Sequence, residues 1–330
     1  MNQLNTCNLC GSENLAFVDI VHDYNRWYSW DFKLYKCKDC GLMFLNPQPD
    51  SEEIMEYYTS DYYQKIGEGS GIQKVLRNLI FFVQKIYVKN PKIFKMMFFF
   101  SPYVRGIKII PNGKYLDVGC GNGAFLYTMQ KINPSWEYQG IEPGEFDQED
   151  MNKHNLNVIK WSLESIHYPD DYFDNITLNH VFEHVSDPSE TIKELRRILK
   201  PGWILIIAVP NSNSLTYKLF GKYFRHIDAP RHLFHYSDKT LKKYAQKANL
   251  KYIKTRYGAF WDQTSFIASW SHYMSSIFWW NLWKKFNNGI GKKNIFIISI
   301  FILLYIILTP LTLLLNLIRY GDSIEVWMRK

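Results

Sequence analysis

From residue 114 onward, short apolar runs alternate with segments in which apolar residues recur at helical spacing. The apolar runs predict strands at residues 114–118, 136–141, 158–160, 173–180, 203–209 and 252–257, and an alternating pattern predicts a last strand at 323–328. Helical spacing predicts helices at 124–131, after Gly144, at 187–199 and at 237–250, with Pro201-Gly202 ending the third of them. Strands that alternate with helices predict a parallel α/β sheet.

The rest of the chain does not follow this alternation. Two C-x-x-C-G pairs flank an aromatic, strand-like stretch near the start, and a Tyr-rich part and a basic amphipathic helical pattern follow. The run Ile295–Ile318 has no charged residue and, as a helix, is long enough to span hydrocarbon. We therefore expect a cysteine module at 1–50, a helical region at 51–110, an α/β core at 111–260, a hydrophobic insertion at 261–320 and a final core strand at 321–330.

Composition and charge indicate the size of the protein and the charge of its partners, but they do not identify a partner. The chain has 330 residues, of which 47% are hydrophobic, and a formal net charge of +8. That length suits one large domain or two modest ones, and the positive charge suits nucleic acid, anionic lipid or a phosphorylated substrate. The polar first residues do not form a secretory signal, so we expect a cytoplasmic protein with reduced thiols.

The strongest motif lies at the end of the first core strand. It reads Leu116-Asp117-Val118-Gly119-Cys120-Gly121-Asn122-Gly123, a strand that enters a glycine-rich turn before a helix. A dinucleotide site would have G-x-G-x-x-G, and Asp117 would repel its pyrophosphate but not a ligand with a cationic end. Glu142 ends the second strand, where a carboxylate can accept hydrogen bonds from both ribose hydroxyls; a solvated acid is the alternative.

With these motifs, Phe173-Asp174, Phe182-Glu183-His184-Val185 and Leu199-Lys200-Pro201-Gly202 follow in order. Over residues 110–260 and the last strand, the chain resembles the class I S-adenosylmethionine-dependent methyltransferases, particularly those near the ubiquinone-biosynthesis and sugar methyltransferases. The resemblance implies a Rossmann-like seven-stranded sheet, with the last strand between the fifth and sixth. It also implies cofactor contacts: Asp117, Gly119 and Gly121 to the amino-acid part, Glu142 to the ribose, Ser162 and Leu163 to the adenine, and Asn179 near the methionine end.

Two histidine clusters supply candidates for a base that deprotonates a hydroxyl acceptor. The first is His180-Val181-Phe182-Glu183-His184, after the fourth strand; its H-x-x-E-H pattern would fit a zinc protease only on a long helix. The resemblance to ubiquinone-type enzymes implies Mg²⁺ here, although His180 replaces an acid, and His184 could instead simply pack against the sheet. The second cluster, Arg225–His235, suits a carboxylate or phosphate of the acceptor, or is a structural loop. Our hypothesis is that His180 or His232 is the base.

The four cysteines of the C-x-x-C-G pairs are Cys7, Cys10, Cys37 and Cys40. Four thiolates in two such pairs suit tetrahedral, structural Zn²⁺, whereas a redox dithiol would be one pair beside a βαβ unit. The resemblance extends here, because similar knuckles followed by a Tyr-rich segment occur in sugar and surface-glycan methyltransferases. This similarity implies a glycan-related acceptor.

The hydrophobic insertion separates two strands of one cytoplasmic sheet, so it must leave and return on the same side. One solution is a two-helix hairpin with Phe266–Trp283 as its first arm, but its tip would carry four lysines. The favoured solution is a re-entrant or interfacial element bent at Pro310, with nearby tryptophans at headgroup depth. The alternatives are a soluble lid and a dimer interface. We expect a peripheral or monotopic protein on an anionic inner membrane face.

These expectations combine into a predicted function. The predicted function is methylation, with S-adenosylmethionine, of a hydroxyl on a membrane-proximal acceptor such as a surface-glycan precursor or a quinone-like lipid. A nucleic-acid methyltransferase is an alternative, but the polar-Pro-Pro-aromatic motif of base-methylating enzymes is replaced by Asn179-His180-Val181-Phe182. A non-catalytic zinc scaffold at the membrane is a second alternative, and it would have no need of Asp117 and Glu142.

Overall fold

The computed structural model describes residues 1–23, 28–50, 53–54, 56–57, 112–160, 163–258, 262–274, 312 and 314–330. The chain divides into two compact units. The first comprises residues 1–50, 210–240 and 255–325, and the second comprises 51–209, 241–254 and 326–330. The predicted basic helical pattern, Ser162 and most of the run Ile295–Ile318 lie outside the described residues.

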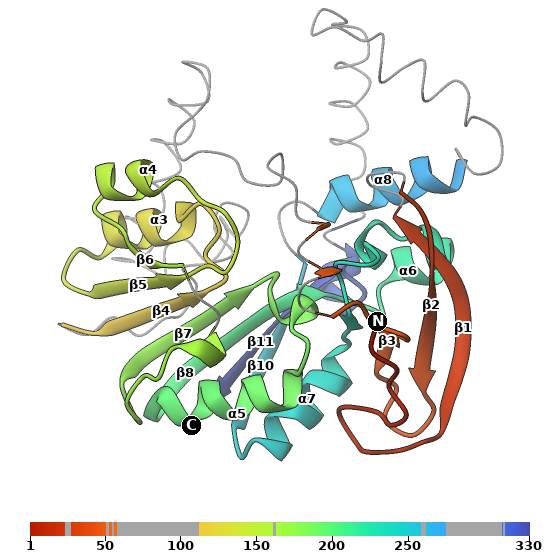
Figure 1. Ribbon diagram of the computed structural model, residues 1–330, viewed down its shortest axis with the longest axis horizontal. Coiled ribbons are helices and arrows are strands. Elements are labelled where there is room, and N and C mark those ends of the chain that lie inside the picture. Colours follow the sequence, from red (N-terminus) through yellow and green to blue (C-terminus); the bar gives the residue numbers. More distant parts are fainter. Residues whose placement is uncertain are drawn as a thin grey trace, which may run out of the picture. The chain divides into compact units, whose positions relative to one another are not determined.

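Most residues of a seven-stranded sheet, with the order β10-β11-β8-β7-β4-β5-β6, belong to the second unit (Figure 1). The strands are β4 (Lys114–Val118), β5 (Glu137–Ile141), β6 (Asn157–Ile159), β7 (Phe173–Asn179), β8 (Leu199–Pro210), β10 (Lys251–Tyr257) and β11 (Ser323–Arg329). The pairs β4–β5, β4–β7, β5–β6 and β7–β8 are parallel. The last strand lies between the fifth and sixth, as the sequence predicts, which confirms the Rossmann-like methyltransferase sheet.

Helices cover both faces of this sheet. The helices α3 (Ala124–Ile132) and α4 (Gln148–Lys153) lie on one face, and α5 (Pro188–Ile198) lies on the other (Figure 1). Beneath α3 and α4, a cluster of buried aromatic and aliphatic side chains forms the core, with the ring of Tyr115 5.7 Å from that of Tyr138. Apolar burial of this kind, at roughly 25 cal/mol per Å², is the main stabilisation of the sheet that carries the site.

One sequence prediction about this sheet is wrong in detail. The fifth strand, predicted at 203–209, begins earlier at Leu199, so that Pro201 and Gly202 lie inside β8, whereas α5 ends at Ile198, within one residue of the predicted helix end. Leu199 pairs with Phe173, but the next pair is Ile204 with Asn175, so the extra residues form an irregularity in β8. Gly202 has a φ of +81° within it and donates its N–H to the carbonyl of Lys330 at 2.8 Å. The strand therefore starts early because its first residue already pairs with β7.

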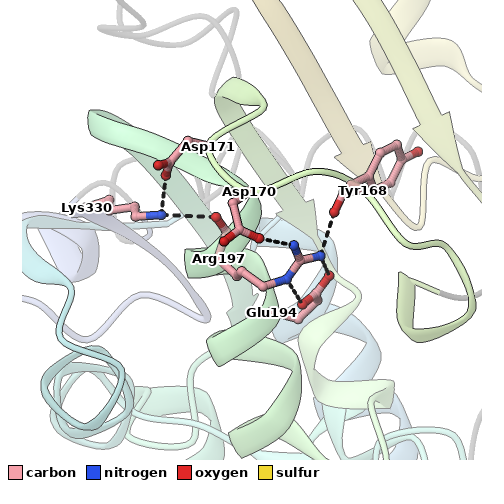
Figure 2. Close-up of polar contacts among 6 residues, drawn as sticks. All are labelled: Tyr168, Asp170, Asp171, Glu194, Arg197 and Lys330. Atoms are coloured by element: carbon pink, nitrogen blue, oxygen red, sulfur yellow. Dashed lines mark hydrogen bonds and ion pairs between the residues drawn. The ribbon is translucent and has the colours of Figure 1, made fainter.

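A polar network lies at the amino-terminal end of β7 (Figure 2). The guanidinium of Arg197 on α5 donates to Glu194 at 2.6 and 2.7 Å, to the carbonyl of Tyr168 at 2.7 Å, and to Asp170. Lys330 reaches the same loop through Asp171 at 2.5 Å. Since ligands of open α/β sheets bind at the carboxyl ends of the strands, this network holds the loop and is not part of the cofactor site.

The first unit contains a four-stranded antiparallel sheet with the order β1-β2-β3-β9. Its strands are β1 (Leu15–Asp23), β2 (Tyr28–Cys37), β3 (Met43–Leu45) and β9 (Phe234–His235). The fourth strand comes from almost 190 residues later in the chain, with Met43 opposite His235 and Phe44 opposite Phe234. Residues 1–50 thus share a sheet with the loop before α7 (Asp238–Lys247), a pairing that the sequence patterns do not predict.

Helices α6 (Leu215–Phe220) and α8 (Asp262–Met274) also belong to the first unit. Short 3₁₀ turns at Gly221–Tyr223 and Arg225–Ile227 follow α6. Among the helices that the structure describes, none combines the length and the hydropathy needed to cross a membrane.

Candidate cofactor site

The glycine-rich turn after β4 is folded by a single carbonyl group of β5. The N–H groups of Gly119 and Cys120 both donate to the carbonyl of Ile141, at 2.7 and 3.0 Å. Gly119 has a φ of +69°, and a Cβ there would lie 2.3 Å from Cγ2 of Val181. At Gly121, with a φ of +54°, a Cβ would meet no described atom within 4 Å. The turn is therefore packed tightly at Gly119 and open to a ligand at Gly121.

Asp117 lies on β4 just before this turn and is buried. Its Oδ1 accepts a hydrogen bond from the hydroxyl of Thr177 at 2.6 Å, and the same hydroxyl oxygen accepts one from Tyr115 at 3.1 Å. Burial raises the pKa of Asp117 to about 7; the hydroxyl of Thr177 lowers the pKa, and the charge of Glu142 raises it. Thr177 was not predicted, although it lies directly opposite Asp117 in the β4–β7 pairing.

Glu142 follows β5 and is also buried. Its Oε2 accepts from the N–H of Gly121 at 2.7 Å, and its Oε1 accepts from the N–H of Gly144 at 2.8 Å. Burial raises the pKa of this carboxyl, whereas the hydrogen bonds from Gly144 and Gly121 lower it. Each carboxylate oxygen keeps capacity for another donor. Two buried acids beside one open backbone turn favour a ligand that carries positive charge and hydroxyl groups.

The other cofactor contacts implied by the resemblance lie at the same edge of the sheet. Asn179 is the last residue of β7, half-buried and paired with Ala208. Leu163 is buried in a 3₁₀ turn, Leu163–Ser165, that follows β6. Because β4, β5, β6 and β7 are parallel, their carboxyl ends meet at one edge, where Asp117 and Glu142 also lie.

Comparison with known proteins agrees with this geometry. The family model described as a methyltransferase domain matches residues 97–255. The chain therefore carries a methyltransferase domain over these residues. The sheet order is the one that the resemblance implies, and the sequence assignment of the fold is confirmed.

Three curated relatives match parts of this domain. An uncharacterized transposon protein of Streptomyces fradiae is 34% identical over 112 residues, covering 32% of this chain and 32% of the relative. The ubiquinone/menaquinone biosynthesis C-methyltransferase UbiE of Geotalea daltonii is 34% identical over 113 residues, covering 32% of this chain and 48% of the relative. The ubiquinone biosynthesis O-methyltransferase of Proteus mirabilis is 31% identical over 108 residues, covering 30% and 43%. The chain thus spans a third to a half of their lengths.

Two of the predicted base candidates lie in the methyltransferase domain, directly after β7. His180 has a φ of +54° and its Nδ1 lies 3.2 Å from Oε1 of Glu183. His184 ends the 3₁₀ turn Phe182–His184 and donates its N–H to the carbonyl of Val181 at 2.9 Å. This segment is one short turn and not a long helix, so the zinc-protease alternative is excluded.

The third base candidate, His232, belongs to the other compact unit. Its Nδ1 lies 2.8 Å from the carbonyl oxygen of His226, and its Nε2 lies 3.8 Å from Oδ2 of Asp228. Beside it, the buried guanidinium of Arg231 contacts Asp228 at 2.5 and 3.0 Å and Asp23 at 2.9 Å. Asp23 comes from β1, and the sequence gives no indication that it joins this loop.

The four predicted zinc ligands come together in the first unit. The Sγ atoms of Cys7, Cys10, Cys37 and Cys40 all lie within 4.8 Å of one another, and two pairs are 3.5 Å apart. Tetrahedral Zn²⁺ with Zn–S bonds of about 2.3 Å places sulfur atoms roughly 3.8 Å apart, so these residues fit the ion. After each pair a glycine with positive φ, Gly11 or Gly41, closes the turn by donating to the first cysteine's carbonyl at 2.8 or 2.9 Å.

Proposed function

We propose that the protein binds S-adenosylmethionine at the turn after β4 and transfers its methyl group to a hydroxyl acceptor. The observation that carries this proposal is the pair of buried acids, Asp117 and Glu142, around a turn that is open at Gly121. When bound, the cofactor supplies a methyl group that its sulfonium already activates. The carboxylate of Asp117 would balance the positive charge of the cofactor, and Glu142 would accept hydrogen bonds from its ribose.

A calorimetric titration with S-adenosylmethionine tests the first half of this proposal. We expect one site, and we expect Glu142→Gln to weaken binding roughly 10-fold, since it replaces charge-assisted hydrogen bonds with neutral ones. Glu145 is a matched control, because it is an exposed acid nearby that pairs with Lys160 at 2.5 Å. Glu145→Gln should bind as the unchanged protein does, and an equal loss in both variants would contradict the assignment.

The acceptor class is the finer part of the proposal. Two of the relatives are named as acting in quinone biosynthesis, which supports a quinone-like lipid, and the cysteine pairs support a glycan precursor through the resemblance. Methyl-labelled cofactor would be added to the protein with a lysate of its host, followed by separation of lipids, glycans and nucleic acids. Label in the lipid or lipid-linked fraction, reduced with Glu142→Gln, is expected; label in nucleic acid would favour the alternative acceptor.

Binding to an anionic membrane surface is the proposed location. The described residues that support it are Leu314, Leu317 and Ile318, which are 53%, 81% and 50% exposed at helical spacing, and Trp270 on α8, which is 46% exposed. Exposed apolar side chains beside cations such as Arg319 suit the headgroup region. Flotation with vesicles containing anionic lipid should carry the protein upward, and Leu317→Glu should weaken this, whereas Leu219→Glu on α6 is the control for an exposed leucine outside this run.

Structural Zn²⁺ is proposed at the four cysteines. Elemental analysis of the purified protein should give one zinc per chain, and Cys10→Ser should lower that content. A protein that folds fully with no metal in the presence of a chelator would contradict the proposal, because structural zinc sites contribute directly to folding free energy.

A further inference from the structure

His180 is held in an unusual backbone conformation at the edge of the methyltransferase sheet. Its φ of +54° lies in the left-handed region, which few residues other than glycine adopt. Its N–H donates to the carbonyl of Ala208 in β8 at 2.9 Å, which extends the β7–β8 pairing by one residue. The ring therefore starts from a backbone position fixed by two central strands, and 37% of the side chain is exposed.

The 3₁₀ turn that follows brings Glu183 back toward this ring. Oε1 of Glu183 lies 3.2 Å from Nδ1 of His180, and only 1% of the Glu183 side chain is exposed. The neighbouring Phe182 is fully buried and packs edge-on against Tyr244, with ring centroids 5.8 Å apart. A carboxylate buried to this degree costs free energy unless polar groups compensate it, so a purely structural position would favour an apolar residue.

We propose that Glu183 is a positioning residue that keeps His180 protonated at Nδ1, so that Nε2 receives the proton of the acceptor hydroxyl. The inference rests on the proposed function. In the step, the hydroxyl oxygen forms a bond to the methyl carbon, the bond from that carbon to sulfur breaks, and the electron pair stays on sulfur. The hydroxyl proton moves to Nε2, and the imidazolium that results lies beside the carboxylate of Glu183, which stabilises its charge.

Side-chain nitrogen NMR on protein labelled at histidine tests this pairing without any acceptor. The signals of His180 would be assigned by their loss in His180→Asn. We expect protonation at Nδ1 in the unchanged protein and mainly at Nε2 in Glu183→Leu, a substitution that suits a buried site. If Glu183→Leu does not fold, Glu183→Gln serves in its place, with a partial shift expected. An unaltered protonation pattern of His180 in the variant that folds would overturn the proposal.

Turnover supplies the second readout. Glu183→Leu should lower methyl transfer roughly 10- to 100-fold while binding of S-adenosylmethionine stays unchanged. Asp150 on α4 is the matched control, since its Oδ1 lies 3.3 Å from Nδ1 of His154, and Asp150→Leu should leave turnover and the His180 signals unchanged. Normal turnover in Glu183→Leu would overturn the positioning role, whereas absent cofactor binding in the unchanged protein would overturn the proposed function itself.

Discussion

The turn after β4 and the loop before β9 are both candidate functional regions, yet different interactions hold them in place. Around the turn, the contacts join β4 and the turn to the neighbouring parallel strands β5 and β7: Gly119 to Ile141, Asp117 to Thr177, and Glu142 to Gly121. The loop is held by a buried arginine and by Asp23, roughly 200 residues earlier in the chain. A regular sheet fixes the first region, whereas a long-range ion cluster fixes the second.

The largest expected effect is on the ion cluster. Arg231→Met would remove the guanidinium that lies 2.9 Å from the fully buried Asp23, and we expect a loss of about 3–5 kcal/mol in the free energy of unfolding. Urea unfolding followed by tryptophan fluorescence would measure the loss. Removing the cation of an exposed pair by Lys193→Ala is the control and should leave the urea midpoint in place. Equal midpoints for all three proteins would show that the cluster does not hold the loop.

The turn should instead be sensitive to added volume. Gly119→Ala would place a methyl group 2.3 Å from Val181, in a backbone conformation that disfavours side chains. We expect the free energy of cofactor binding to become less favourable by about 3 kcal/mol, which is roughly 100-fold weaker binding. Gly121→Ala meets open space and should cost only about 1 kcal/mol. Calorimetric titration compares the two. Partial recovery in Gly119→Ala combined with Val181→Ala is expected, and its absence would point to strain alone.

Each unit also contains a buried aspartate with a raised pKa. Burial raises the pKa of Asp117 to about 7 and that of Asp322 to about 6. Because the unfolded value is about 3.9, the folded state binds the proton of each aspartate more tightly than the unfolded state does. The contribution of each aspartate to stability is therefore fully present below about pH 4 and is lost as the pH rises through the folded pKa. For Asp117 we expect a fall on the order of 2 kcal/mol between pH 5 and pH 8. Urea unfolding across this range should show a smaller fall in Asp117→Asn.

The pH dependence of cofactor binding should depend on Asp117 and not on Asp322. A bound cation stabilises the ionised form of Asp117, so S-adenosylmethionine should bind more tightly as the pH rises from 5 to 8. Asp322→Asn should keep that trend, and Asp117→Asn should lose it. A trend that survives in Asp117→Asn would mean that another group titrates with the ligand.

The smallest effect concerns Asn175 on β7, in the sheet of the methyltransferase domain. Among the described residues, neither polar atom of this fully buried side chain has a hydrogen-bond partner. Asn175→Leu, which has a similar shape, should therefore stabilise the protein by about 1 kcal/mol. The urea midpoint measures the gain. A loss would indicate that Asn175 has a polar partner beyond the described residues, and Thr177→Val, which removes a hydroxyl that is bonded, should be destabilising by contrast.

The sequence could predict the turn after β4 better than the loop before β9, because regular strands position the turn and a long-range ion cluster positions the loop. Asp117, Glu142 and Asn179 lie at ends of apolar runs, so period and spacing were enough to place them at one edge of the sheet. Thr177 was missed because strand pairing, not pattern, brings it to Asp117. Asp23 and the two-residue β9 were missed because an ion pair across 200 residues and a strand of that length leave no periodic pattern to detect.

The pairing of β3 with β9 has a consequence for synthesis on the ribosome. The strand that completes the sheet of residues 1–50 is made about 190 residues after β3. At about 5–20 residues per second, that delay is roughly 10–40 s. Throughout it, one edge of β3 is open and the buried position of Asp23 has no arginine beside it. Strands β1, β2 and β3 are thus exposed to nascent-chain chaperones before β9 has been synthesised.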